Sequence, residues 1–110
     1  MIEETIKRIE ARIQAADTLT PERRKELIEL LSTLKAEAAI LARTHGEQAQ
    51  NIVGLTQVTA QAAMRTDQDP QVLNRSVQAL RRSVEDFETT HPRLAQIVNS
   101  ISTTLSSSGI

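Results

Sequence analysis

The feature that most limits how this chain can fold is a run of apolar residues at heptad spacing between Leu73 and Leu105. Successive members are separated alternately by four and three residues. Nine of the ten are large and apolar, His91 being the exception: Leu73, Val77, Leu80, Val84, Phe87, Leu94, Val98, Ile101 and Leu105. This spacing makes one face of a helix apolar, as in bundles and coiled coils. The run therefore predicts an all-α protein with a coiled-coil-like seam from Leu73 to Leu105.

Proline and glycine residues indicate where the helices begin and end. Pro21 and Pro70 each follow a residue that can cap a helix, and proline is favoured at the first helical position. Gly46 suits a helix end, and Pro92 predicts a kink or a restart because it lacks an amide hydrogen. The predicted helices form a single domain over residues 1–110 and occupy residues 2–16, 21–44, 47–65, 70–90 and 92–106.

A second apolar run joins helix 21–44 to helix 47–65. Leu27, Leu31, Leu34, Ala38 and Leu41 share one face, and the pattern continues in phase across Gly46. Helix 47–65 is therefore predicted to be nearly collinear with helix 21–44. Folding back at a turn near Gln68 then gives an antiparallel bundle, or a long helical hairpin, of three to four helices. This register places Ala38 beside Val98 and His45 opposite His91.

The stretch from Gln48 to Met64 contains no charged residue in seventeen positions. It is either a weakly ordered connector rich in Gln and Thr, or a helix with a face buried against another chain, where a charge would be costly to desolvate. The second interpretation predicts self-association as a twofold homodimer. The predicted interface residues are Ile52, Val53, Leu55, Val58, Met64, Val72, Leu73 and Val77.

Composition argues against several function classes. Thirteen basic and fourteen acidic residues give a net charge of −1, which lacks the attraction to phosphate that nucleic-acid binding requires. One Phe, no Trp and no Tyr leave no stacking platform, and the absence of cysteine removes thiolate chemistry. No apolar window is long enough to span a membrane, and the amino terminus is acidic. We expect a cytoplasmic protein that binds neither nucleic acid nor membrane.

The two histidines raise a metal-binding alternative. Glu88 and His91 have the i, i+3 spacing used in carboxylate-bridged metal bundles, and His45 is predicted to lie opposite His91. Such sites need carboxylates on all four helices, and Ala42 stands where a glutamate before His45 would be required. The histidines are otherwise explained as residues at helix ends. We find no catalytic constellation and expect no cofactor, so the chain is predicted not to be an enzyme.

The carboxyl-terminal half resembles a known family. Residues 83–94, residues 98–105 and the Gly109-Ile110 end are similar to an uncharacterised bacterial family of short helical proteins, domain of unknown function 4404. The most specific part is the Phe-Glu-x-x-His-Pro-x-Leu run that begins at Phe87. The resemblance implies a small bacterial protein with no assigned activity. Together these observations predict a non-catalytic helical interaction or scaffold protein that self-associates or binds another protein.

Overall fold

The computed structural model describes residues 1–65 and 67–108. Within these residues the chain forms five α-helices and one 3-10 turn, with no strand, so the predicted all-α class is confirmed. The elements are α1 (Ile2–Ala15), α2 (Pro21–Ala42), α3 (Gly46–Met64), α4 (Pro70–Ser83), the 3-10 turn η1 (Glu85–Phe87) and α5 (Pro92–Ser108). Five helices pack together, in place of the predicted three or four.

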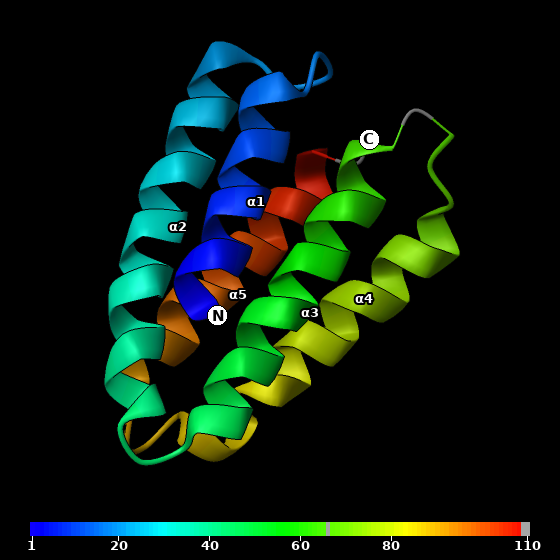
Figure 1. The fold of residues 1–110 in the computed structure, drawn as a ribbon. Coiled ribbons are helices and arrows are strands. Elements are labelled where there is room, and N and C mark those ends of the chain that lie inside the picture. Colours follow the sequence, from blue (N-terminus) through cyan, green and yellow to red (C-terminus); the bar gives the residue numbers. More distant parts are fainter. Residues whose placement is uncertain (66, 109–110) are drawn as a thin grey trace.

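Successive helices run in opposite directions, and α3 lies in the middle of the bundle (Figure 1). In the described part of the chain, α3 is the helix that contacts all four others. Its buried threonines, Thr56 and Thr59, each donate a hydrogen bond to the carbonyl four residues earlier, at 2.9 and 2.8 Å. The segment is therefore an ordered central helix, and contacts within its own chain account for much of its lack of charge.

The prediction that α2 and α3 are collinear is wrong. The chain reverses at residues 43–45, and α3 packs antiparallel to α2 (Figure 1). A continuous helix over residues 21–64 would be about 66 Å long, whereas the longest dimension of the molecule is 38 Å. The long hairpin is thus folded in half, which buries the broad apolar surface that two extended arms would leave exposed.

The helix pairs expected from the long hairpin nevertheless remain in contact. Helix α2 still packs against α5, and α3 still packs against α4. The predicted register placed Ala38 beside Val98, which puts residue 99 beside Glu37. In the structure Arg93 lies 4.0 Å from Glu37, so the register of α2 and α5 differs from the predicted one by about six residues. The chain breaks at residues 43–45 and again between α4 and α5, so the two halves need not follow one continuous register.

The apolar seam between Leu73 and Leu105 belongs to the core, but it does not lie on one helix. Its nine apolar members are at most 9% exposed. Helix α4 ends at Ser83, short of the predicted residue 90. Residues 84–91 leave the α-helical path, and α5 begins at Pro92, which cannot donate to the carbonyl of Glu88, and runs back antiparallel to α4. The phase survives because α4 and α5 both pack against α3.

The connection between α1 and α2 is held by Arg24. Its guanidinium donates to the carbonyls of Ile13 at 3.3 Å, Ala16 at 2.7 Å and Leu19 at 3.5 Å. The carbonyl of Ile13 lies in the last turn of α1, and those of Ala16 and Leu19 follow it, so this one side chain ties the end of α1 to the connection before α2.

Replacing Arg24 with alanine is expected to lower the free energy of unfolding by about 2 kcal/mol, because bonds from a charged donor are lost. Urea unfolding followed by far-ultraviolet circular dichroism measures the change. Arg24→Lys should recover only part of the loss, since an ammonium cannot reproduce the fork of the guanidinium. Lys25→Ala, on an exposed side chain, is the control. An equal effect at both positions would contradict this role for Arg24.

Candidate functional site

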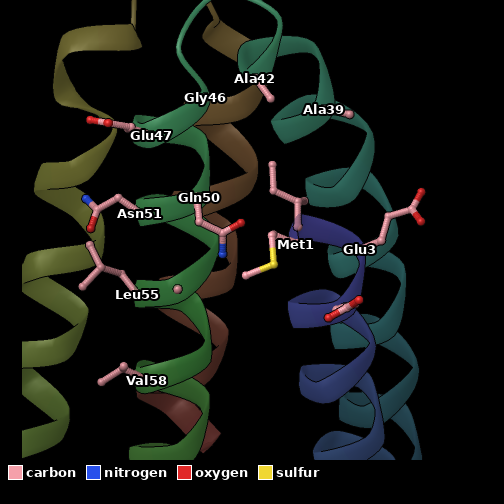
Figure 2. Close-up of a pocket in the computed structure, with 13 residues that line it drawn as sticks. Met1, Glu3, Ala39, Ala42, Gly46, Glu47, Gln50, Asn51, Leu55 and Val58 are labelled. Carbon is pink, nitrogen blue, oxygen red and sulfur yellow. The ribbon is translucent and has the colours of Figure 1, made fainter.

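A shallow groove of about 1200 Å³ lies where the start of α1, the end of α2 and the outer side of α3 meet (Figure 2). The side chains that matter most for its chemistry are Met1, Glu4, Glu47, Gln50, Leu55 and Val58. The groove is apolar and amide-lined in the middle, with carboxylates near the start of both helices. Such a surface is suited to contact with another protein.

The outer side of α3 follows directly from its sequence. Glu47, Asn51, Gly54 and Val58 recur at intervals of three or four residues and therefore share one face of the helix. Val58 is 50% exposed, while Leu55 beside it is half-buried. This face carries no charge from Asn51 to Val58, although it points away from the core.

Gly54 has no structural requirement within the chain. A Cβ atom placed on it would meet no other atom within 4 Å. Its φ angle is not positive, so no backbone conformation demands glycine. Glycine inside a helix destabilises it by about 1 kcal/mol relative to alanine. The protein thus carries a destabilising residue at an open position of its surface.

A second shallow groove, of about 590 Å³, lies further along α1 and α3. It is lined by Arg8 and Arg12 of α1 and by Gln57 and Met64 of α3. Since α1 and α3 lie side by side and run in the same direction (Figure 1), the two grooves occupy one surface. We call this surface, from Met1 to Ala15 and from Glu47 to Met64, the α1/α3 face.

Charge is distributed unequally along the α1/α3 face. Glu4 and Glu47 lie near its start, and Arg8 and Arg12 lie further along. The ion pairs of the described residues are Arg65 with Asp67 at 3.1 Å and Arg93 with Glu37 at 4.0 Å. The charged side chains that line the two grooves take part in neither pair: Glu3, Glu4, Glu47, Arg8 and Arg12.

The Arg65 and Asp67 pair lies just beyond the end of α3. Two hydrogen bonds of 3.1 Å from the guanidinium lower the pKa of the Asp67 carboxyl and raise that of Arg65. Both side chains are mostly exposed, so the pair contributes little to stability.

The predicted interface residues divide into two groups. Four are at most 6% exposed and face the core of their own chain: Ile52, Val53, Leu73 and Val77. The other four reach the surface: Leu55 and Met64 in part, Val58 and Val72 by about half. The prediction assumed collinear arms with an uncovered helix 47–65, whereas α3 is covered by four neighbours.

Sequence reasoning did not identify Gly54, Glu4, Arg8 or Arg12 as members of a surface. The spacing of four residues between Glu4, Arg8 and Arg12 places them on one side of α1. That signal was present in the sequence. Only the tertiary structure shows that this side of α1 continues into the outer side of α3.

The two histidines meet a common aromatic ring. Phe87 makes edge-to-face contacts with His45, at 5.4 Å between ring centroids, and with His91, at 5.9 Å. Each histidine Nδ1 also bonds to the hydroxyl of the preceding threonine, at 2.8 Å for His45 and 3.0 Å for His91. Glu88 is exposed. Among the described residues no three His, Asp or Glu side chains are grouped closely enough to hold a metal ion.

Comparisons with known proteins give one match. A family model described as "Domain of unknown function (DUF4404)" matches residues 27–110, which confirms the predicted resemblance and extends it into α2. No curated protein and no solved structure matches the chain. Over residues 1–65 and 67–108, no helix has both the length and the hydropathy needed to cross a lipid bilayer.

Proposed function

The chain belongs to the family described as domain of unknown function (DUF4404), and we propose that it is a non-catalytic helical interaction protein that associates with a second copy of itself. The observation that carries this proposal is the outer side of α3. It has no charge between Asn51 and Val58, Val58 is 50% exposed, and Gly54 is open to close approach. A helix that faced only solvent would gain from charged side chains at these positions.

The chemistry of the groove supports binding in preference to catalysis. Its lining residues include glutamates, amides and apolar side chains, but neither a hydroxyl nucleophile nor a histidine. Covalent catalysis needs a nucleophile within hydrogen-bond reach of a base. The buried hydroxyls of Thr56 and Thr59 are committed to carbonyls of their own helix. The groove presents apolar surface, amides and carboxylates, which suit contact with another protein.

The size of the molecule is compatible with a stable dimer. Its two longest dimensions are 38 and 24 Å, so its broad side covers about 900 Å², close to the roughly 800 Å² that each partner contributes to a standard interface.

Absolute mass in solution tests the proposal. Light scattering over a hundredfold range of concentration, with refractive index as the concentration signal because the chain has no Trp or Tyr, should give twice the chain mass of 12.2 kDa. The mass should fall toward that of one chain on dilution if the dimer is weak. A mass of 12.2 kDa at every concentration would contradict self-association.

A further inference from the structure

We infer that two copies pack through their α1/α3 faces in an antiparallel arrangement with twofold symmetry, so that Val58 of each copy lies over Gly54 of the other. The inference rests on the proposed self-association and specifies how the two copies meet. Three features of the face support it: the half-exposed side chain of Val58, the open Gly54 four residues earlier, and charges of opposite sign at separate places.

The first step concerns shape. When two α3 helices cross antiparallel at a point midway between Gly54 and Val58, each Val58 side chain faces Gly54 of the second copy. No atom lies within 4 Å of the Cβ position of Gly54, and Val58 is 50% exposed. A large side chain therefore meets a small residue, which fills a packing layer without strain. The twofold axis makes this contact twice.

The second step concerns charge. Arg8 of α1 lines the same groove as Gln57 of α3, so the midpoint between Gly54 and Val58 is nearly level with Arg8. Reversal of α1 about that level places Glu4 opposite Arg12 of the second copy twice, and places Arg8 opposite Arg8 once at the axis. A parallel twofold arrangement about α3 would instead carry the two α1 helices to opposite sides of the axis, where Glu4 would meet no Arg12. The two pairs of opposite charge outnumber the single pair of like charge, so the face favours the antiparallel orientation.

These features point to a second copy in preference to an unrelated partner. An interface with twofold symmetry must be complementary to itself. On this face Val58 and Gly54 lie equally far from one point on α3. Glu4 and Arg12 lie equally far along α1 from the level of that same point. The uncharged middle of α3 then lies where water is most completely excluded.

Replacing Val58 with glutamate tests the shape of the contact. It brings two carboxylates to the axis of the dimer, and we expect the dimer dissociation constant to rise at least about 100-fold. The matched control is Val72→Glu, because Val72 is 47% exposed and lies on α4, outside the α1/α3 face. That variant should change the constant less than about twofold. Equal effects of the two substitutions would overturn the arrangement.

Replacing Gly54 with alanine should have opposite effects on folding and on association. Alanine removes the helix penalty of glycine, so at dilutions where the chain is a monomer its melting temperature should rise by roughly 4 °C. The added methyl group fills the space that Val58 of the second copy occupies, so the dimer should weaken about tenfold. An alanine variant that is more stable yet dimerises as well as the natural chain would exclude close contact at Gly54.

Charge exchange tests the orientation. Glu4→Arg alone and Arg12→Glu alone should each weaken the dimer about tenfold, whereas the double variant should recover the original constant within about threefold. Failure of the double variant to recover would overturn the antiparallel orientation. A natural chain that is monomeric throughout would instead reject the proposed self-association, so the two failures can be told apart. Far-ultraviolet circular dichroism verifies that each variant is folded.

Discussion

Replacing Phe87 with alanine is expected to lower the free energy of unfolding by about 3 to 5 kcal/mol. Phe87 is only 9% exposed and is the single aromatic ring of the Phe, Trp and Tyr class in the chain. It belongs to η1, a 3-10 turn of three residues between α4 and α5. The ring fills the end of the bundle where the chain reverses direction twice, so truncation leaves a large cavity there.

The aromatic contacts of Phe87 identify side chains that border that cavity. The ring meets His45 at the start of α3 and His91 before α5, both edge to face. These rings are themselves bonded to Thr44 and Thr90. His45 and both of these bonds are exposed to solvent, so the loss should fall in the lower part of the range for a large-to-small substitution.

Urea unfolding followed by far-ultraviolet circular dichroism is the appropriate measurement, because the chain has no Trp or Tyr to report by fluorescence. Glu88→Ala, one residue away on an exposed side chain, is the control and should change stability by less than about 0.5 kcal/mol. A loss below about 1 kcal/mol for the phenylalanine variant would contradict its place in the core.

Replacing Leu34 with alanine should have the second largest effect, a loss of about 2 to 5 kcal/mol. Leu34 is 0% exposed. It lies on α2, which packs against α1, α3 and α5, so several helices border the space that the side chain would vacate. The same unfolding experiment measures the loss.

Ile40 provides a matched control for this prediction. It lies on the same helix, is also a large aliphatic residue, and is 43% exposed. Ile40→Ala should cost less than about 1 kcal/mol, because little apolar area is buried there. Similar losses at the two positions would mean that the inner and outer faces of α2 are assigned incorrectly.

Local signals in the sequence were sufficient to identify where two of the helices begin. The Thr20 side chain accepts a hydrogen bond from the amide of Arg23 at 3.2 Å, and Asp69 accepts one from the amide of Gln71 at 2.9 Å. Each cap is followed by a proline at the first helical position. Such signals act over a few residues and so can be recognised without the rest of the fold.

Heptad spacing also identified the core but not the path of the chain through it. Leu73 and Leu105 are both buried as predicted, yet they lie on helices that run in opposite directions. Periodicity records which face of a helix is apolar. It carries no information on whether the next helix continues or turns back, which explains why α2 and α3 were predicted to be collinear across Gly46.

The sequence by itself determined the helical class, the apolar faces and the caps, because each depends on residues close together in the chain. Only the tertiary structure decided that the hairpin folds in half, that α3 becomes central, and that Ile52 is buried while Val58 is half-exposed. In a helix such as α3, which is uncharged from Gln48 to Met64, the pattern of charge does not distinguish the buried side from the exposed side. The distinction arises from neighbours distant in sequence, whose packing buries more apolar surface than an extended hairpin would.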